Sequence, residues 1–520
     1  MKYIIFFAVV PVLFLTCGTS PGGGGSGEYD GVMEIRYNEH HQVIDGFGGS
    51  NAWTRLPSDI ETADEVVKLL YSKTEGAGFT ILRNRIPFRE RLSGDDDPGL
   101  NDGFVVRKSD NTYDYTVNAD GTKTFNLNWN SWDLSGTRHL ISRINSLGRN
   151  GPETLTIMST PWTPPNNRVT QWKEDVAGLG GNLDYTIDWT RPDWWGRLKK
   201  DKYNDYADLL ADYVKNFEAR MGAPLAILSV QNEPNWKVKY ESAYWSGVDI
   251  RDFLAVIGQR FPMKGVVLGE NGLGIMAPEY ENFNIRFDEM IQPSLNDASA
   301  NSVFTHIGLH QYNASWDSSG MAGAKAFPQI IASGKRFWQT EVSNSGGPNM
   351  PKGTGIDNAL FFAKMIHYDM TLAQTNAFLY WWLWTGSGDT DFAGSLIKVD
   401  GDTVIAALRL YAMGQYSRFI RPGWLRLEAT TTPVPRVFSS AFRNPATGEI
   451  AVVLVNESTA PRTVYLNLEG ARFVSLESWR TSATEKLTPL GPVNGRRQIP
   501  AEIIVNLPAK SISTFYGRVE

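Results

Sequence analysis

The chain has 520 residues, of which 42% are hydrophobic and 20% are charged, so it is long enough to bury a large core. Its net charge of −6 offers no basic surplus to neutralise phosphates, which excludes a nucleic acid as the expected partner. One cysteine excludes a disulfide within the chain, and one cysteine with six histidines gives no evident metal-ligand cluster, so we expect no metal and no cofactor.

The first residues have the pattern of an export signal. Lys2 is followed by an apolar run, Tyr3–Leu15, that is too short to span a bilayer. Cys17 follows this run after Thr16 and resembles the site at which bacterial lipoproteins are lipidated; ordinary secretion with cleavage nearby is the alternative. Gly18–Gly27 then predicts a flexible tether. We therefore expect an exported protein, held to the outer membrane by a lipid anchor at the cell surface or in the periplasm, or otherwise secreted.

From residue 46 onward, short apolar segments alternate with helical patterns. The segments are centred on Phe47, Leu82, Ile157, Leu228, Val267, Ile307, Trp338 and Leu379. Helical patterns occur at 61–70, 203–221, 251–261, 324–332, 357–372 and 402–418. Eight strands alternating with helices predict a (β/α)8 TIM barrel, in which the active site lies at the C-terminal ends of the strands. The polar, turn-rich residues 95–130 predict an insertion with a hairpin.

After residue 423 the pattern changes to period-two alternation with turn residues between the segments, which predicts an antiparallel β-sandwich. The weakly alternating residues 31–44 are expected to pair with it. We therefore divide the chain into a signal peptide (1–17), a Gly-rich linker (18–28), N-terminal strands of the β-sandwich (29–45), the catalytic barrel (46–418) and the C-terminal β-sandwich (419–520).

Two of the predicted barrel strands end in a glutamate. Ala226–Pro234 places Glu233 after the fourth strand, and Arg336–Val342 places Glu341 after the seventh. Pro234 cannot continue a strand because it has no N–H to donate. Two carboxylates facing one cleft are what retaining glycoside hydrolysis needs, so we predict Glu233 as the acid/base and Glu341 as the nucleophile. For either glutamate alone, a salt bridge at a strand end is the alternative.

Polar residues at neighbouring strand ends fit the same chemistry. Asn232 can bind a sugar hydroxyl beside the reacting carbon. Arg83 can keep Glu341 ionised, and Tyr312 can donate a hydrogen bond to it. His310 is expected either to bind sugar or to have a structural role.

Aromatic residues are abundant, with 17 tryptophans in the chain. Trp53, Trp162, Trp382 and Trp384 lie at predicted strand ends, where their rings can stack on sugar faces. Because side chains alternate along a strand, Trp381 is expected to point outward from the barrel. For each of these tryptophans, a place in the core is the alternative.

Six motifs together resemble glycoside hydrolase family 30, from about residue 33 to the C-terminus. They are Asp45–Gly49, Gly78–Ile86, Ser159–Pro165, Ser229–Pro234, Trp338–Glu341 and Gln415–Gly423. The resemblance implies a retaining enzyme with its acid/base after strand four and its nucleophile after strand seven. It also implies a β-sandwich beside the barrel, built from the C-terminal region and an N-terminal strand.

The resemblance implies a plant polysaccharide or oligosaccharide as substrate. The stretch Leu82–Ile86 is most similar to the xylan-acting branches of the family, so an endo-β-1,4-xylanase is the first hypothesis. A β-1,6-glucanase or a glucosylceramidase-like β-glucosidase is the alternative within the family, and a non-catalytic glycan-binding lipoprotein is the alternative from another class. Arg85 and Arg168 are candidates to bind a glucuronic acid side group, with a surface salt bridge as the alternative. For the oligomeric state, a monomer is the default expectation.

Overall fold

The computed structural model describes residues 29–88, 104–106, 108, 112–166, 170–176, 195–238, 240–312, 325–344, 350–386, 394–493 and 502–520. The predicted signal segment, Cys17, the Gly-rich tether and Arg168 lie outside these residues. Among the described helices, none combines the length and the apolar character that a membrane crossing requires.

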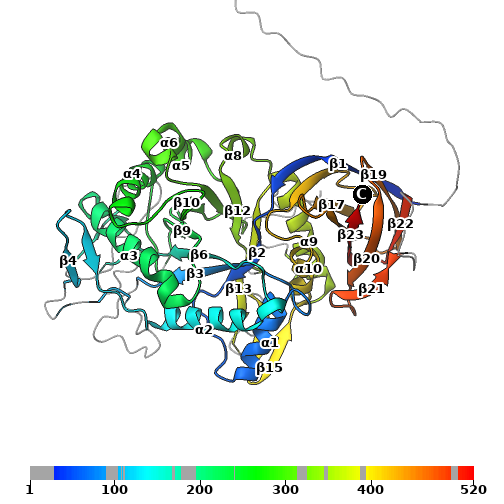
Figure 1. Cartoon of the computed structure of the whole chain (residues 1–520), viewed down its shortest axis with the longest axis horizontal. Coiled ribbons are helices and arrows are strands. Elements are labelled where there is room, and N and C mark those ends of the chain that lie inside the picture. Colours follow the sequence, from blue (N-terminus) through cyan, green and yellow to red (C-terminus); the bar gives the residue numbers. More distant parts are fainter. Residues whose placement is uncertain are drawn as a thin grey trace, which may run out of the picture.

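Eight parallel strands close into a barrel, which occupies the left half of Figure 1. They are β2 (Gly46–Ser50), β3 (Ile81–Ile86), β6 (Thr156–Pro161), β9 (Ile227–Ser229), β10 (Gly274–Tyr280), β11 (His306–His310), β12 (Arg336–Glu341) and β13 (Ala377–Thr385). Each strand pairs with the next, and β13 pairs with both β12 and β2, which closes the sheet. The predicted TIM barrel is confirmed.

Helices surround the barrel because its strands are buried on both faces. They are α1 (Ile60–Tyr71), α2 (Trp132–Ser146), α3 (Tyr203–Met221), α4 (Gly247–Met263), α5 (Phe287–Met290), α6 (Gln292–Asn296), α7 (Ala298–Asn301), α8 (Pro328–Ala332), α9 (Ile356–Tyr368) and α10 (Leu408–Ser417). The α3 helix begins and ends at the predicted residues. It stops there because Gly222 adopts a left-handed conformation, with φ of 83°, and its N–H caps the carbonyl of Glu218.

The strand predicted at Val267 is wrong. Val267 is 66% exposed, whereas a strand in a closed barrel must bury both of its faces. The fifth strand is β10 instead, a later segment whose seven residues are all buried. This difference matters for the site, because β10 carries an acidic residue, Glu279, near its C-terminal end. A fifth strand at Val267 does not include Glu279.

The helix predicted to start at Asp402 is also partly wrong. Residues Thr403–Ala406 form β15, which pairs antiparallel with β14 (Ser395–Asp400) and extends the sheet outward from β13. The α10 helix begins only after this hairpin. Within the predicted insertion, β4 (Tyr115–Val117) and β5 (Lys123–Phe125) form the expected hairpin. The shortest pair, β7 (Lys173–Glu174) and β8 (Arg197–Leu198), lies between β6 and α3 in the chain.

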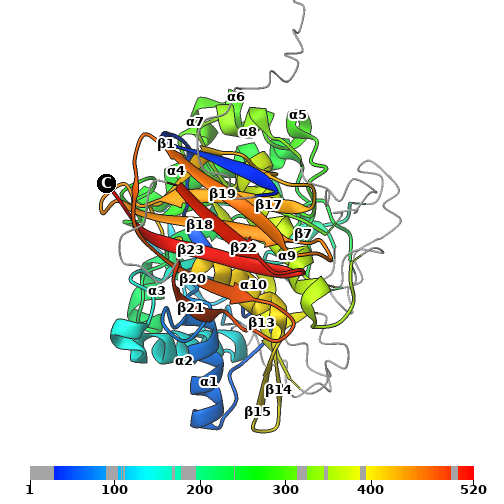
Figure 2. The same ribbon diagram turned by 90° about the vertical axis from the view of Figure 1, so that its right-hand side faces the viewer.

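The second domain is one nine-stranded sheet with its own apolar core. In Figure 2 the strands of this sheet face the viewer. In spatial order its strands are β21 (Thr488–Pro492), β20 (Phe473–Thr481), β23 (Ser511–Val519), β18 (Glu449–Asn456), β17 (Val437–Arg443), β16 (Leu425–Ala429), β1 (Gly31–Val43), β19 (Arg462–Glu469) and β22 (Glu502–Leu507). All pairs are antiparallel except β1 with β19. The predicted second domain of β-sandwich type is confirmed.

Helices α9 and α10 lie between the barrel and this sheet (Figure 1). Gln415 of α10 is buried in that junction. Its Nε2 donates to Thr481 Oγ1 at 2.9 Å, and its Oε1 accepts from Thr514 Oγ1 at 2.6 Å. The two domains are thus joined by a satisfied buried amide as well as by apolar packing, so the β domain supports one side of the barrel.

Gly48 of β2 shows why the barrel needs glycine here. A Cβ at this position would lie 2.0 Å from the carbonyl oxygen of Ile81 in the neighbouring strand. We expect Gly48→Ala to destabilise the protein by at least about 2 kcal/mol, because a backbone atom cannot move aside. Urea unfolding measures this loss. The matched control is Gly355→Ala, where the added carbon would meet nothing within 4 Å; equal losses in the two variants would contradict the explanation.

Candidate active site

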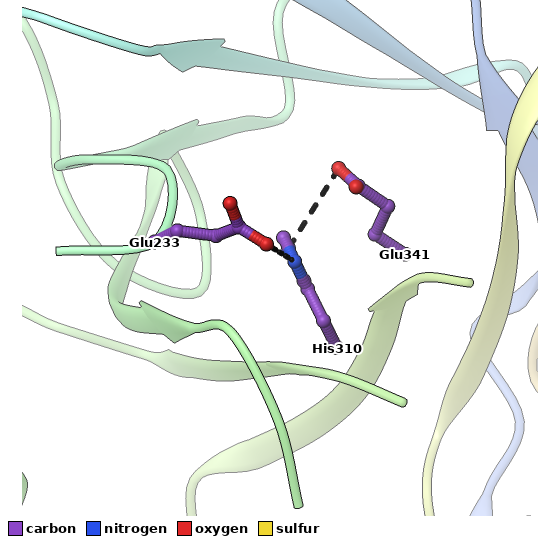
Figure 3. Close-up of side chains that lie close together, drawn as sticks. All are labelled: Glu233, His310 and Glu341. Carbon is purple, nitrogen blue, oxygen red and sulfur yellow. Dashed lines mark hydrogen bonds and ion pairs between the residues drawn. The ribbon is translucent and has the colours of Figure 1, made fainter. Parts of the chain in front are cut away.

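The ends of three barrel strands bring Glu233, His310 and Glu341 together. One carboxylate oxygen of each glutamate and a ring nitrogen of His310 all lie within 4.8 Å of one another. His310 Nδ1 is 2.8 Å from Glu233 Oε1, and its Nε2 is 3.9 Å from Glu341 Oε2. In Figure 3 the imidazole points up between the two carboxylates. The two predicted acids therefore face one another, as the barrel prediction requires.

The backbone at Glu233 is held in an uncommon conformation. Its φ of 46° lies in the left-handed region, which costs a non-glycine residue on the order of 1 kcal/mol. The Glu233 N–H donates to the Glu279 carbonyl at 2.9 Å, and the Asn232 N–H donates to the Pro161 carbonyl at 2.9 Å. The neighbouring strands on both sides thus fix the turn that carries the predicted acid/base.

Arg83 of β3 is a fully buried cation beneath the two acids. Its Nη1 donates to Glu341 Oε2 at 2.7 Å, its Nη2 donates to Asn232 Oδ1 at 2.6 Å, and its Nε is 2.9 Å from Glu279 Oε1. Its guanidinium also lies 4.7 Å from the ring centre of Trp162. Burial lowers the pKa of Arg83, but Glu279 and Glu341 outweigh that effect and raise it. Arg83 therefore stays charged and fixes the orientation of Glu341.

Glu279 is a further counter-charge to Arg83, and the sequence pattern does not point to it, because that pattern puts the fifth strand at Val267. It is completely buried at the end of β10, and its Oε2 accepts from Ser229 Oγ at 2.7 Å. Burial raises its pKa, but Arg83 and His310 outweigh burial and hold the pKa at about 2. The sequence signal that could have identified Glu279 is the same as for the other two acids: a buried apolar run that ends close to a glutamate.

Glu341 is held by donors on two sides. Tyr312 Oη donates to its Oε1 at 2.8 Å, opposite the Arg83 contact to its Oε2. Burial raises the pKa of Glu341, and the positive charges of His310 and Arg83 oppose that shift. The predicted partners of this carboxylate, Arg83 and Tyr312, are thus both in contact with it.

A cavity of about 570 Å³ opens above these groups. It is lined by Trp53, Trp162, Glu233, Trp236, Tyr240, Glu281, Tyr312, Glu341, Trp381 and Trp382. Asn232, Arg83 and His310 are buried behind this lining and are not part of it. Arg83 contacts Glu341 and Asn232, and His310 contacts Glu233. An aromatic, concave site with a few convergent polar groups is typical of a ligand-binding cleft.

Two tryptophan predictions are wrong. Trp381 lines the cavity and does not point outward, because the pairing of β13 with β2 shifts register between Tyr380 and Trp382 and breaks strict alternation. Trp384 lies in the core instead of the cleft. Its ring is buried, and its Nε1 donates to the carbonyl of Arg55 at 2.8 Å.

Arg85 is not available to bind a glucuronic acid group, which corrects the role suggested for it. It is fully buried, its Nε donates to Glu241 Oε2 at 3.0 Å, and it forms a second ion pair with Asp133. Its guanidinium lies 4.8 Å from the ring centre of Trp53. Arg85 therefore supports the floor of the aromatic cluster.

Trp236, Tyr240 and Glu281 line the cavity and were not predicted. Trp236 and Tyr240 follow Glu233 in the same loop, so their closeness to a strand-end acid was a usable signal. The pKa of Glu281 is raised to about 7, mainly by burial. The charge of Glu233 adds to this shift, and a hydrogen bond from Asn235 opposes it.

Glu233, His310 and Glu341 are residue types that also bind metals. Here, however, the imidazole lies between the carboxylates (Figure 3). Burial lowers the pKa of His310, but the nearby carboxylates Glu341, Glu233 and Glu279 outweigh burial and raise it to about 10. A protonated imidazole carries a hydrogen on each ring nitrogen. In this site Nδ1 lies 2.8 Å from Glu233 Oε1, and Nε2 lies 3.6 Å from Glu279 Oε1 and 3.9 Å from Glu341 Oε2.

The raised pKa of His310 predicts a specific pH dependence of stability. Its pKa in the fold, about 10, exceeds the ordinary value of 6.5, so the protonated ring stabilises the protein fully below pH about 6.5. That contribution is lost as the pH rises through about 10. We expect urea unfolding of the wild type to weaken more steeply from pH 7 to 10 than that of His310→Gln. Parallel pH profiles for the two proteins would contradict the assignment.

Comparison with known proteins agrees with this geometry. Residues 189–391 match the family model described as O-glycosyl hydrolase family 30. A glucuronoxylanase XynC from Bacillus subtilis is 25% identical over 368 residues, which cover 69% of this chain and 73% of that protein.

Solved structures share the fold over most of the chain. The family 30 subfamily 8 xylanase Xyn30A from Clostridium acetobutylicum superposes with a TM-score of 0.67 and 26% identity, covering 94% of this chain and 99% of that one. The endo-β1,6-glucanase BT3312 has a TM-score of 0.63 at 17% identity, covering 94% of each chain, and shows the fold alone. With its family match, its xylanase relatives and its facing strand-end acids, this chain is a glycosidase that belongs to glycoside hydrolase family 30.

Proposed function

We propose that the protein is a retaining β-glycoside hydrolase, and specifically an endo-β-1,4-xylanase. The observation that supports the retaining mechanism is the separation of Glu233 and Glu341, which have carboxylate oxygens within 4.8 Å of one another. Retaining enzymes hold their two carboxyls about 5–5.5 Å apart, whereas inverting enzymes leave about 6.5–9.5 Å for a water molecule.

In this proposal Glu341 attacks the anomeric carbon while Glu233 protonates the departing oxygen. A glycosyl ester on Glu341 results, and Glu233 then removes a proton from the water that hydrolyses it. The two hydrogen bonds from Arg83 and Tyr312 orient the attacking carboxylate. Arg83 also donates to Asn232 Oδ1 at 2.6 Å, so the guanidinium that orients Glu341 is itself held in place behind the cavity lining.

Xylan is favoured because the similar glucuronoxylanase and the similar subfamily 8 xylanase both carry that activity in their names. The β-1,6-glucanase with the same fold is less similar, at 17% identity. The cleft suits a polysaccharide, because indole rings line it and offer flat apolar faces for sugar rings. A β-1,6-glucanase or a β-glucosidase stays the alternative within the family.

Replacing Glu341 by Ala should lower turnover on xylan at least about 10³-fold, because the covalent step loses its nucleophile. The release of reducing ends measures turnover. External azide should restore activity in Glu341→Ala with inverted stereochemistry and in Glu233→Ala with retained stereochemistry. Near wild-type turnover in Glu341→Ala would refute the assignment, and glycan binding without any release of reducing ends by the wild type would support a binding lipoprotein instead.

The substrate is tested by product profiles on glucuronoxylan, arabinoxylan and β-1,6-glucan. We expect soluble xylo-oligosaccharides of several lengths from the two xylans, because an endo-acting cleft cuts within the chain, and no products from the glucan. Chromatography of the products measures this. Cleavage of the glucan alone would replace the xylanase proposal with the first family alternative.

A further inference from the structure

A third carboxyl lines the cleft beside the two reacting acids. Glu281 comes directly after β10 and lines the same cavity as Glu233 and Glu341. The backbones that carry Glu281 and Glu233 run side by side, because the Glu233 N–H donates to the Glu279 carbonyl at 2.9 Å. A double displacement uses two carboxyls, so the third one has no role in the bond-forming steps.

Glu281 lacks the cations that hold the other acids of the site. Arg83 contacts Glu279 and Glu341, whereas the partner of Glu281 is an uncharged amide: Asn282 Nδ2 donates to its Oε1 at 2.6 Å. In the described part of the chain, no cation forms an ion pair with Glu281. The first cation after it in the sequence, Arg286, pairs with Glu289 instead, at 2.9 Å.

A half-buried carboxyl without a matching cation gives up its proton reluctantly. This is the physical reason why the pKa of Glu281 is raised to about 7, with burial as the largest cause. Near neutral pH, Glu281 therefore changes its charge within the cleft.

The titratable groups that face Glu281 come from three other strand ends. They are Glu233 and Tyr240 after β9, His310 and Tyr312 at the end of β11, and Glu341 at the end of β12. The charge of Glu233 raises the pKa of Glu281, and the charge of His310 lowers it. Burial raises the pKa of both tyrosines, so they stay neutral.

The interaction between Glu281 and Glu233 acts in both directions. If a negative charge on Glu233 opposes ionisation of Glu281, a negative charge on Glu281 opposes ionisation of Glu233 to the same extent. The proposed first step requires a proton on Glu233, and that proton becomes harder to keep as the pH rises. Glu281 acquires its charge in the same pH range.

We propose that Glu281 is an electrostatic positioning residue for the acid/base: once ionised, it holds the proton on Glu233 and extends the first step to higher pH. Glu281 forms no bond to the substrate in this account, and its own proton exchanges with solvent. The inference rests on the proposed retaining mechanism and adds the residue that sets its alkaline limit.

The test compares the pH dependence of kcat/KM on two substrates. Xylohexaose needs the proton of Glu233 to release its leaving sugar, whereas 2,4-dinitrophenyl β-xylobioside releases a phenolate that needs no proton. In Glu281→Gln, the alkaline limb for xylohexaose should move down by about 0.5–1 pH unit, a roughly three- to tenfold loss of kcat/KM on that limb, because the neighbouring charge is gone. The limb for the aryl glycoside should stay in place. Glu281→Asp keeps a carboxylate and should restore part of the wild-type limb.

The matched control is Glu289→Gln, which removes a carboxylate from α5, in the same connection after β10 but outside the cavity lining. Its two profiles should equal those of the wild type. An unmoved limb for xylohexaose in Glu281→Gln would overturn the inference and leave the glycosidase proposal intact, and so would equal displacements on both substrates. Absence of wild-type turnover on both substrates would overturn the proposed function and, with it, this role of Glu281.

Discussion

The site depends on one buried interaction, the contact of Arg83 with Glu341 and Glu279. A fully buried guanidinium is costly unless its charge is matched, and here two carboxylates and the Asn232 amide surround it. Removing either acid would leave the buried guanidinium with one carboxylate in place of two, so the group is constrained as a unit. The same contact fixes the position of Glu341. Glu341 thus neutralises the buried charge of Arg83, and Arg83 in turn orients the Glu341 carboxylate.

Two cations and three carboxyl groups meet in this site. Arg83 contacts both Glu279 and Glu341, and His310 contacts Glu233. In the proposed first step Glu341 becomes an ester and loses its charge, while Glu233 gives a proton to the departing oxygen. Negative charge therefore passes from one carboxyl to the other within a group that already contains two buried cations.

Barrel closure is what brings these charges together. Arg83, Glu279, His310 and Glu341 come from four strands, and they meet because β13 pairs with both β12 and β2. The close approach of β2 to β3 allows no side chain at Gly48. On the outer side, the β domain packs on α9 and α10, so the frame that fixes the site extends beyond the barrel itself.

The sequence by itself determined the barrel, the second β domain and the two facing glutamates. Local patterns of apolar residues predict the strands and helices. The runs Asn-Glu-Pro and Thr-Glu then mark where two of the strands end in polar residues. Only the tertiary structure decided the rest. The local pattern places the fifth strand at Val267 and so omits Glu279, because the pattern does not tell which apolar run is buried on both faces. Trp381 enters the cleft, and Trp384 the core, because a register shift in β13 is set by the neighbouring strand and leaves no trace in the alternation of its own residues.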